Sequence, residues 1–155
     1  MSDIDDRPGS LVGAVRPIRR ILLATDLSPA SESATDQAIA LAGELGATLL
    51  VVSVIDSDVT TIRRGLVERM DQRRAAREAA AQALVFRGRQ AGIAVSFLVW
   101  EGTPGPAIVE AARSEAEDLV VVGSHGRGRV GRLVLGSVSD HVVRHAPCPV
   151  LIVRP

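Results

Sequence analysis

The sequence predicts a single α/β domain built on a five-stranded, mostly parallel sheet with helices on both faces. Five short aliphatic runs alternate with four stretches that carry helical spacing or helix-start signals. The aliphatic runs are apolar at successive positions, which indicates strands that are covered on both faces. Strict alternation of strands and helices calls for parallel strands joined by right-handed crossovers. The length of 155 residues suits one domain.

The expected strands share a nearly continuous content of Val, Leu and Ile. They are Arg20–Thr25, Thr48–Ile55, Ile93–Trp100, Asp118–Val122 and Pro149–Val153.

Two of the expected helices begin with the same pair of signals. Ser28 before Pro29 predicts the start of the first helix, because serine caps helix N-termini and proline fits the first helical position. Gly46 predicts its end. Thr103 before Pro104 predicts the start of the third helix by the same reasoning.

The second helix is expected from about 61 to 90 and the fourth from Ser137 to about His145. The Arg run of the second helix is interpreted as a solvated face, opposite an apolar face. That apolar face is formed by Leu66, Met70, Ala81 and Leu84. In the fourth helix, Asp140 stands three residues after Ser137, as in a capping box.

Composition excludes several classes of function. The formal net charge is zero and aromatic residues make up 2%, so the chain lacks the basic field and the stacking side chains of a nucleic-acid binder. All eighteen basic residues are Arg. The absence of Lys excludes a Walker A lysine and Schiff-base chemistry.

Cys148 is the single cysteine, which excludes an internal disulfide and a cysteine metal cluster. The first residues are polar and acidic, unlike a signal peptide, and no apolar stretch approaches ~20 residues. We therefore expect a cytoplasmic protein that does not associate with membranes. Residues 1–17 are expected to form a flexible tail before a domain that spans 18–155.

Two strand ends mark the expected binding site. In a doubly wound sheet, ligands bind beyond the carboxyl ends of the strands, where the strand order reverses. The first strand ends in Thr25-Asp26, which places a carboxylate at this edge, and the fourth runs from Val122 directly into Gly123.

Glycines after the fourth strand predict a loop that binds phosphate. Gly123 and Gly126 are followed nine residues later by Gly136-Ser137, which opens a helix. Consecutive backbone N–H groups in such a turn form an anion-binding nest, and a helix N-terminus offers further N–H groups and a positive dipole end. Arginines in the intervening loop either add positive charge to this site or are solvated; they are Arg127, Arg129 and Arg132.

The sequence resembles the universal stress protein family over nearly all of 19–154. The resemblance lies in I-L-L-A-T-D-L-S, S-V-I-D, G-T-P, V-V-G-S-H-G-R-G-R, L-G-S-V-S-D-H-V-V-R-H and A-P-C-P-V-L-I-V-R. The spacing G-x2-G-x9-G-[S/T] is similar to that of the ATP-binding branch of the family. It falls on Gly123, Gly126, Gly136 and Ser137.

The resemblance implies a Rossmann-like (HUP-type) sheet with strand order 3-2-1-4-5 and a site for ATP, accompanied by Mg²⁺ or Mn²⁺. Carried over by position, adenine and ribose contacts fall on Ala24, Thr25, Asp26 and Val54. Ribose and phosphate contacts fall on Gly123, Gly126, Gly136, Ser137, Val138 and Ser139. The resemblance also implies a homodimer formed through the last strand, Val150–Val153.

Several residues admit two interpretations. Asp26 is either a catalytic acid or a ligand of ribose, adenine or metal, and we favour a ligand because the sequence places no partner for a dyad. His125 is either a general base or a packing residue of the loop, and we favour packing. Cys148 is either a redox sensor or a packed thiol, and we favour the packed thiol. Trp100 is expected in the core or in a dimer contact.

His141 and His145 have the i, i+4 spacing of helical metal ligands. Without a third ligand, they are interpreted as surface histidines.

The expected function is that of a regulatory module of the stress response that binds ATP and transmits its presence to an unidentified partner. No catalytic residue is assigned. Two alternatives remain open: a slow ATPase or nucleotidyl transferase on the same fold, and a partner-binding protein with a vestigial site. The S-G-G-x-D-S-type loop of related adenine-nucleotide hydrolases is absent after the first strand.

Overall fold

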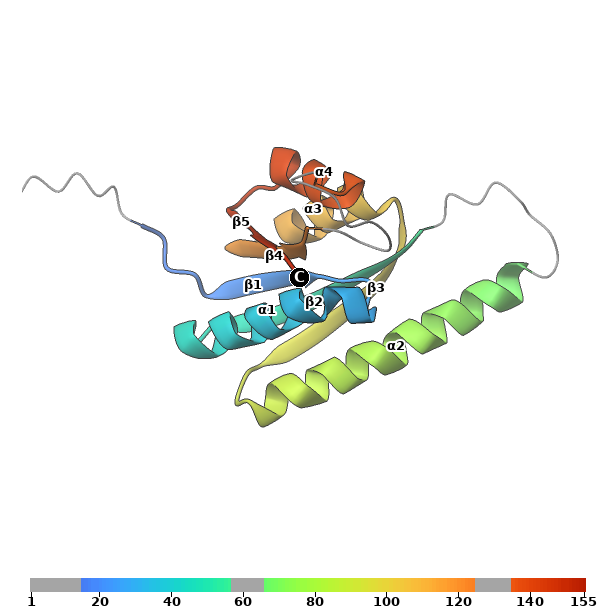
Figure 1. Ribbon diagram of the computed structural model, residues 1–155, viewed down its shortest axis with the longest axis horizontal. Helices are drawn as coiled ribbons and strands as arrows, with labels where there is room; N and C mark the ends of the chain where they lie inside the picture. Colours follow the sequence, from blue (N-terminus) through green and yellow to red (C-terminus); the bar gives the residue numbers. More distant parts are fainter. Residues whose placement is uncertain (1–14, 57–65, 125–134) are drawn as a thin grey trace, which may run out of the picture.

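A computed structural model describes residues 15–56, 66–124 and 135–155; the side chains at 66–68 fall outside that description. Within these ranges the chain forms one parallel sheet of five strands in the order β3-β2-β1-β4-β5 (Figure 1), which confirms the predicted topology. The strands are β1 (Arg20–Ala24), β2 (Thr48–Asp56), β3 (Val95–Gly102), β4 (Leu119–Gly123) and β5 (Val150–Val153).

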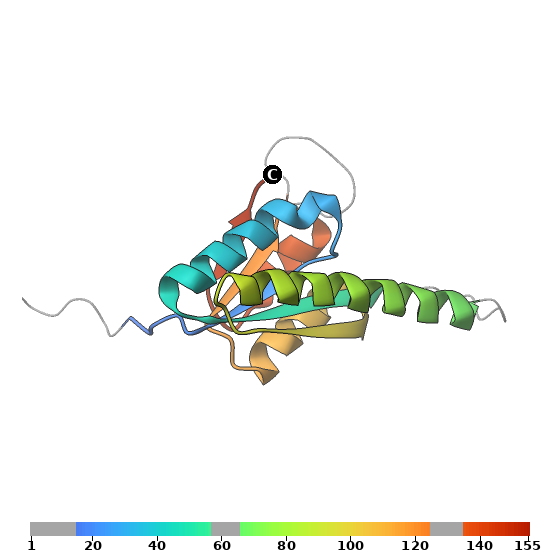
Figure 2. The ribbon, with the colours of Figure 1, turned by 90° about the horizontal axis from the view of Figure 1, so that it is seen from below.

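Helices cover both faces of the sheet. A 3-10 turn, η1, precedes the first helix, and the helical elements are η1 (Pro29–Ser31), α1 (Glu32–Leu45), α2 (Leu66–Gln90), α3 (Pro104–Ser114) and α4 (Ser137–His145). Helices α1 and α2 lie on one face and α3 and α4 on the other (Figure 1). The amino-terminal end of α2 reaches beyond the strands, as a second view also shows (Figure 2).

Two aliphatic cores lie on opposite faces of the sheet, because successive side chains of a strand point to opposite sides. The core beneath α1 and α2 takes alternate strand positions such as Ile21, Leu23 and Val51. The core beneath α3 and α4 takes the positions between them, such as Leu22 and Val52. All five of these side chains are at most 1% exposed, which explains the continuous apolar runs in the sequence.

The strand boundaries differ from the prediction by one or two residues at most. The predicted start of the second helix, at about 61, lies outside the described residues. The strand β3 begins at Val95 rather than at Ile93, because the chain is still leaving the turn at Gly92, where φ is 79°. Ile93 is nevertheless buried. Gly46 ends α1 in the left-handed conformation, at φ 62°, as predicted.

In the part of the chain that the structure describes, the strand β5 lies at an edge of the sheet and pairs with β4 alone. Its four residues are half-buried, so the edge is neither covered nor fully exposed. At the other end of the described chain, residues 15–17 are exposed and have no regular structure. The rest of the predicted flexible tail lies outside the described residues, and that prediction stands untested.

No helix in the described ranges is both long enough and apolar enough to cross a membrane.

Candidate functional site

A cavity of about 500 Å³ opens at the carboxyl ends of β1, β2 and β4 and is bordered by α2, α3 and the start of α4. This is the switch point of the sheet, since the chain leaves β1 toward β2 on one side and leaves β4 toward β5 on the other. The cavity brings together nine of the predicted site residues. They are Ala24, Thr25, Asp26, Val54, Gly123, Gly136, Ser137, Val138 and Ser139. The predicted Gly126 and Arg127 lie outside the described residues.

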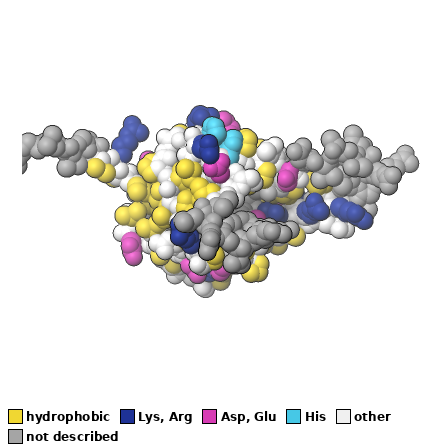
Figure 3. Space-filling model, turned by 45° about the horizontal axis from the view of Figure 1, so that its top comes forward, with side chains coloured by type: hydrophobic (Ala, Val, Ile, Leu, Met, Phe, Trp, Pro, Cys, Tyr) yellow, Lys and Arg dark blue, Asp and Glu magenta, His cyan; other side chains and the backbone are white. Residues whose placement is uncertain are grey.

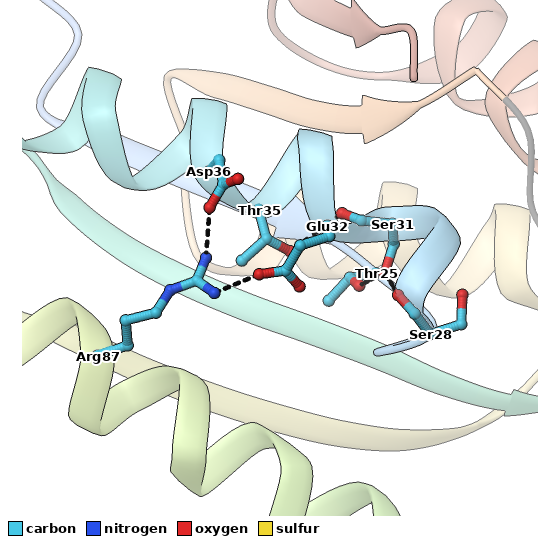
Figure 4. Close-up of polar contacts among 7 residues, drawn as sticks. All are labelled: Thr25, Ser28, Ser31, Glu32, Thr35, Asp36 and Arg87. Atoms are coloured by element: carbon cyan, nitrogen blue, oxygen red, sulfur yellow. Dashed lines mark hydrogen bonds and ion pairs between the residues drawn. The ribbon is translucent and has the colours of Figure 1, made fainter.

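The turn after β1 is held by a chain of hydroxyl groups (Figure 4). Thr25 Oγ1 donates to Ser31 Oγ at 2.8 Å, and Ser31 Oγ donates to the carbonyl of Ser28 at 2.8 Å. The Leu27 N–H donates to Thr25 Oγ1 at 2.9 Å. These bonds hold Leu27 at φ 60°, a left-handed conformation that is uncommon for a leucine and is found most often at functional sites.

The Asp26 carboxylate is fixed within the same turn. Its Oδ1 accepts hydrogen bonds from the Ser28 N–H at 3.0 Å and from the Ser28 hydroxyl at 2.6 Å. Ser28 was predicted to cap the first helix, but its side chain makes no capping bond and η1 intervenes before α1. The Ser28 side chain therefore orients the acid that lines the cavity instead of capping a helix.

An arginine of α2 holds the start of α1 in place. Arg87 forms ion pairs with Glu32 and, at 2.8 Å, with Asp36 (Figure 4). Thr35 adds a bond from its hydroxyl to the Ser31 carbonyl at 3.1 Å. The ion pairs are exposed and contribute little stability each, but they tie α2 to the start of α1, directly after Ser31.

The amino-terminal end of α4 opens into the cavity beside Gly123. The Gly136 N–H donates to the Ser124 carbonyl at 3.0 Å, and the Ser124 N–H donates to the Val153 carbonyl at 2.8 Å. The buried Ser139 hydroxyl bonds the Gly136 carbonyl at 3.0 Å. These contacts anchor the helix start to the ends of β4 and β5.

The predicted capping box at Ser137 is wrong. The N-cap residue is Gly136, with no side-chain capping bond, and Ser137 is the first helical residue. Asp140 instead pairs with Arg144, at 3.0 Å from the guanidinium Nε. The first N–H groups of a helix have no partner within it, so an uncapped start facing a cavity is suited to an anion.

Two charged residues at the β2 side of the cavity were missed by the sequence reasoning. Asp56 ends β2 as Asp26 follows β1, and the same argument from strand ends could have found it. Arg77 of α2 also lines the cavity, and its Nη1 donates to Ser53 Oγ at 2.5 Å. The interpretation of the α2 arginines as a solvated face is therefore wrong for Arg77, which no motif distinguishes from its neighbours.

The structure places several of the residues for which the sequence admitted two interpretations; His125 lies outside the described residues. His141 and His145 stack with ring centroids 4.2 Å apart. Histidine side chains are exposed on the face drawn in Figure 3. The described residues contain no group of three or more possible metal ligands. Burial raises the pKa of the Cys148 thiol, which disfavours a reactive thiolate. Trp100 is 38% exposed at the β3 edge and does not belong to the core.

The chain is a doubly wound α/β domain with a helix terminus facing a cavity at its switch point, which is the place where domains of this class bind ligands. The profile of the Universal stress protein family matches residues 17–154. This chain belongs to that family.

Individual relatives agree with this assignment. A universal stress protein of Thermus aquaticus is 40% identical over 138 residues, which cover 88% of this chain and 98% of that protein. The structure of universal stress protein UspA from Lactobacillus plantarum is 26% identical with a TM-score of 0.75, covering 90% of this chain and 100% of that one. A universal stress protein in complex with cAMP is 27% identical with a TM-score of 0.69, covering 89% of this chain and 98% of that one.

Proposed function

We propose that this chain is an ATP-binding regulatory module of the stress response, which holds the nucleotide as a signal and not as a substrate for turnover. The observation that carries the proposal is the start of α4, which presents Gly136 to Ser139 to the cavity beside Gly123. The nucleotide complex of a 27% identical relative supports a nucleotide as the ligand. The glycine spacing that resembles the ATP-binding branch supports ATP in particular.

The cavity offers different chemistry to the two ends of a nucleotide. Near β1 and β2 its wall is apolar at Ala24 and Val54, which suits the face of a purine base. The α4 side presents the backbone of a helix start, which suits phosphates. We therefore assign adenine and ribose to the β1–β2 side and the phosphates to the α4 side.

A divalent cation would enter this site with the phosphates. Mg²⁺ is commonly held by one or two carboxylates together with substrate phosphates, and not by a cage made of protein alone. Of the carboxylates that line the cavity, Asp26 follows β1, the strand next to β4, and is therefore the candidate, whereas Asp56 ends β2 on the nucleoside side. We propose Mg²⁺ or Mn²⁺ as the companion of ATP, to be tested by repeating the titration in the presence of a chelator.

The environment of Asp26 favours binding over catalysis. One carboxylate oxygen already accepts two hydrogen bonds from Ser28, which commits it to the conformation of the turn. A general base needs a lone pair directed at the proton that it removes. ATP turnover well above one per minute, lost in Asp26→Ala with the fold intact, would instead support the enzyme alternative.

The last strand supports a further part of the proposal, which is assembly into a homodimer. An edge strand presents a row of backbone groups that can pair with another chain. The strand β5 is such an edge, with half-buried apolar side chains at Val150–Val153. We propose that two copies pair through this strand, and leave the regulatory partner unidentified.

Isothermal titration of the purified protein with ATP tests nucleotide binding. We expect the wild type to bind, and Gly123→Ala and Gly136→Ala to bind roughly tenfold more weakly or worse, because a methyl group at either position intrudes where phosphates approach the backbone. The matched control is Gly43→Ala, which makes the same chemical change near the far end of α1. Absence of binding by the wild type, or unchanged binding by both cavity variants, would contradict the proposal.

A further inference from the structure

A serine interrupts a largely apolar, buried strand of the sheet. The strand β2 is apolar on either side of Ser53, which is 1% exposed. A buried hydroxyl needs a hydrogen-bond partner to offset the loss of water, and Ser53 accepts one from Nη1 of Arg77 at 2.5 Å. The bond draws the guanidinium of a long, flexible side chain to the carboxyl end of β2.

Arg77 differs in this respect from Arg74, which precedes it by three residues on α2. Arg74 is 40% exposed and pairs with Glu101 at 3.4 Å and with Glu78 at 4.0 Å. Both arginines are half-buried, but only Arg77 lines the cavity. The two arginines carry the same charge on the same helix but occupy different environments.

Arg77 reaches the cavity on the side away from the start of α4. It bonds Ser53 of β2, and β2 is separated from β4 by β1 in the sheet. Neighbouring strands lie about 4.8 Å apart, so the two ends of the cavity are roughly 10 Å apart. A nucleotide with its phosphates at α4 therefore extends its base and ribose toward Arg77.

A guanidinium is suited to this part of a nucleotide. It carries several N–H donors in a planar fork, and the bond from Nη1 to Ser53 orients that fork. The ring nitrogens of a purine and the ribose hydroxyl oxygens are acceptors, and the flat guanidinium also stacks on aromatic rings.

We propose that Arg77, oriented by Ser53, binds the nucleoside end of the nucleotide in this cavity. The inference rests on the proposed function and adds to it a residue that recognises base and ribose, while α4 holds the phosphates.

The test compares three ligands, adenosine, AMP and ATP, on the full-length protein by isothermal titration. For Arg77→Met we expect Kd to increase roughly tenfold. The factor should be the same for all three ligands, because all three contain the nucleoside. The control Arg74→Met removes the same charge from the same helix and is expected to leave all three values unchanged. Ser53→Ala is expected to weaken binding less than Arg77→Met, since the guanidinium remains but is no longer oriented.

The outcomes separate the inference from the proposed function. Binding of all three ligands by Arg77→Met with wild-type affinity, in a protein that unfolds at the wild-type urea midpoint, would overturn the inference alone. An increase in Kd for Arg77→Met that grows from adenosine through AMP to ATP, and that exceeds the increase for Arg74→Met, would also overturn the inference. Arg77 would then be a phosphate ligand. A wild type that binds none of the three would remove the proposed function and the inference with it. If Arg77→Met is poorly folded, Ser53→Ala takes its place. An increase in Kd by the same factor for adenosine, AMP and ATP would then support the inference, and unchanged values would overturn it.

Discussion

Glu117 is a buried acid at the end of β4 remote from the cavity. It is 8% exposed, and within the described ranges its Oε2 is buried without a hydrogen-bond partner. Burial raises the pKa of this carboxyl to about 7; nearby Arg20 opposes the rise, and Glu115 and Asp118 add to it. In the folded protein Glu117 is therefore mostly the neutral acid below about pH 7.

The raised pKa of Glu117 predicts that stability falls as the pH rises. The folded state holds the proton up to about pH 7, whereas the unfolded chain releases it near the ordinary pKa of 4.5. Below about pH 4.5 Glu117 is protonated in both states, and its stabilising contribution to the free energy of unfolding is fully present. As the pH rises from 4.5 to about 7, this contribution falls by roughly 3 kcal/mol. Urea unfolding at pH 5 and at pH 8 measures this loss.

Glu117→Gln provides the comparison, because glutamine has a similar shape and does not titrate. The fall in stability between pH 5 and pH 8 should be smaller in the variant than in the wild type by about the same amount. Equal falls in the two proteins would show that Glu117 is not the group responsible.

At the scale of elements, a glycine sets how closely α2 approaches the sheet. A Cβ at Gly88 would overlap Cγ2 of Val95 in β3, and Val95 is itself buried. Valine is stiff at χ1, so it cannot easily move aside. We expect Gly88→Ala to lower the free energy of unfolding by about 1–3 kcal/mol, measured by urea denaturation, although alanine is the better helix former.

The opposite sign is expected for the same substitution in α1. A Cβ at Gly43 would meet only Cδ1 of Ile93, at 3.9 Å, which is an ordinary contact. Gly43→Ala should therefore raise the free energy of unfolding by up to about 1 kcal/mol through helix propensity. If both substitutions raise the free energy of unfolding, helix propensity rather than close packing decides the effect at Gly88.

The elements were predictable where local chemistry determines them. Aliphatic runs predicted the position of each described strand, and Gly46 predicted the end of α1. Burial and backbone conformation depend on residues that are adjacent in the sequence, so local patterns reveal them. Helix starts were less predictable, since Ser28 bonds Asp26 instead of a helix and Gly136 takes the capping position expected of Ser137. A hydroxyl has several nearby partners of similar energy, and tertiary contacts decide among them.

The candidate site was predictable in part for the same reason. The residues on its strand ends and helix start are close in sequence to recognisable signals, and the cavity includes nine of them. Arg77 could not be found, because its place depends on how α2 packs against β2 and on a single hydroxyl, Ser53. In a polar helix with many arginines, the neighbouring sequence does not indicate which arginine makes such a contact.

At the scale of the whole molecule, the free edge at β5 predicts how two copies meet. Pro149 and Val153 direct their carbonyls to β4, so Val150 and Ile152 direct their backbone groups to the open edge. Ile152→Pro removes an outward N–H and spares the bonds to β4. We expect this variant to be monomeric and the wild type dimeric, by analytical ultracentrifugation.

Ile152→Ala is the matched control, since it also removes the side chain from the core beneath α3 and α4 but keeps the N–H. It should remain dimeric. A monomeric wild type, or equal dimerisation of the two variants, would rule out pairing through this edge.

The cavity at the switch point has a thermodynamic consequence for the whole chain. Its walls come from strands β1, β2 and β4 and from helices α2, α3 and α4, so it exists only when these elements are assembled. A ligand that fills it binds the folded state and not the unfolded one. At a free concentration of 100 times Kd, such a ligand adds about 2.7 kcal/mol to the free energy of unfolding. The abundance of the ligand in the cell would then set the fraction of this protein that resists unfolding and proteolysis.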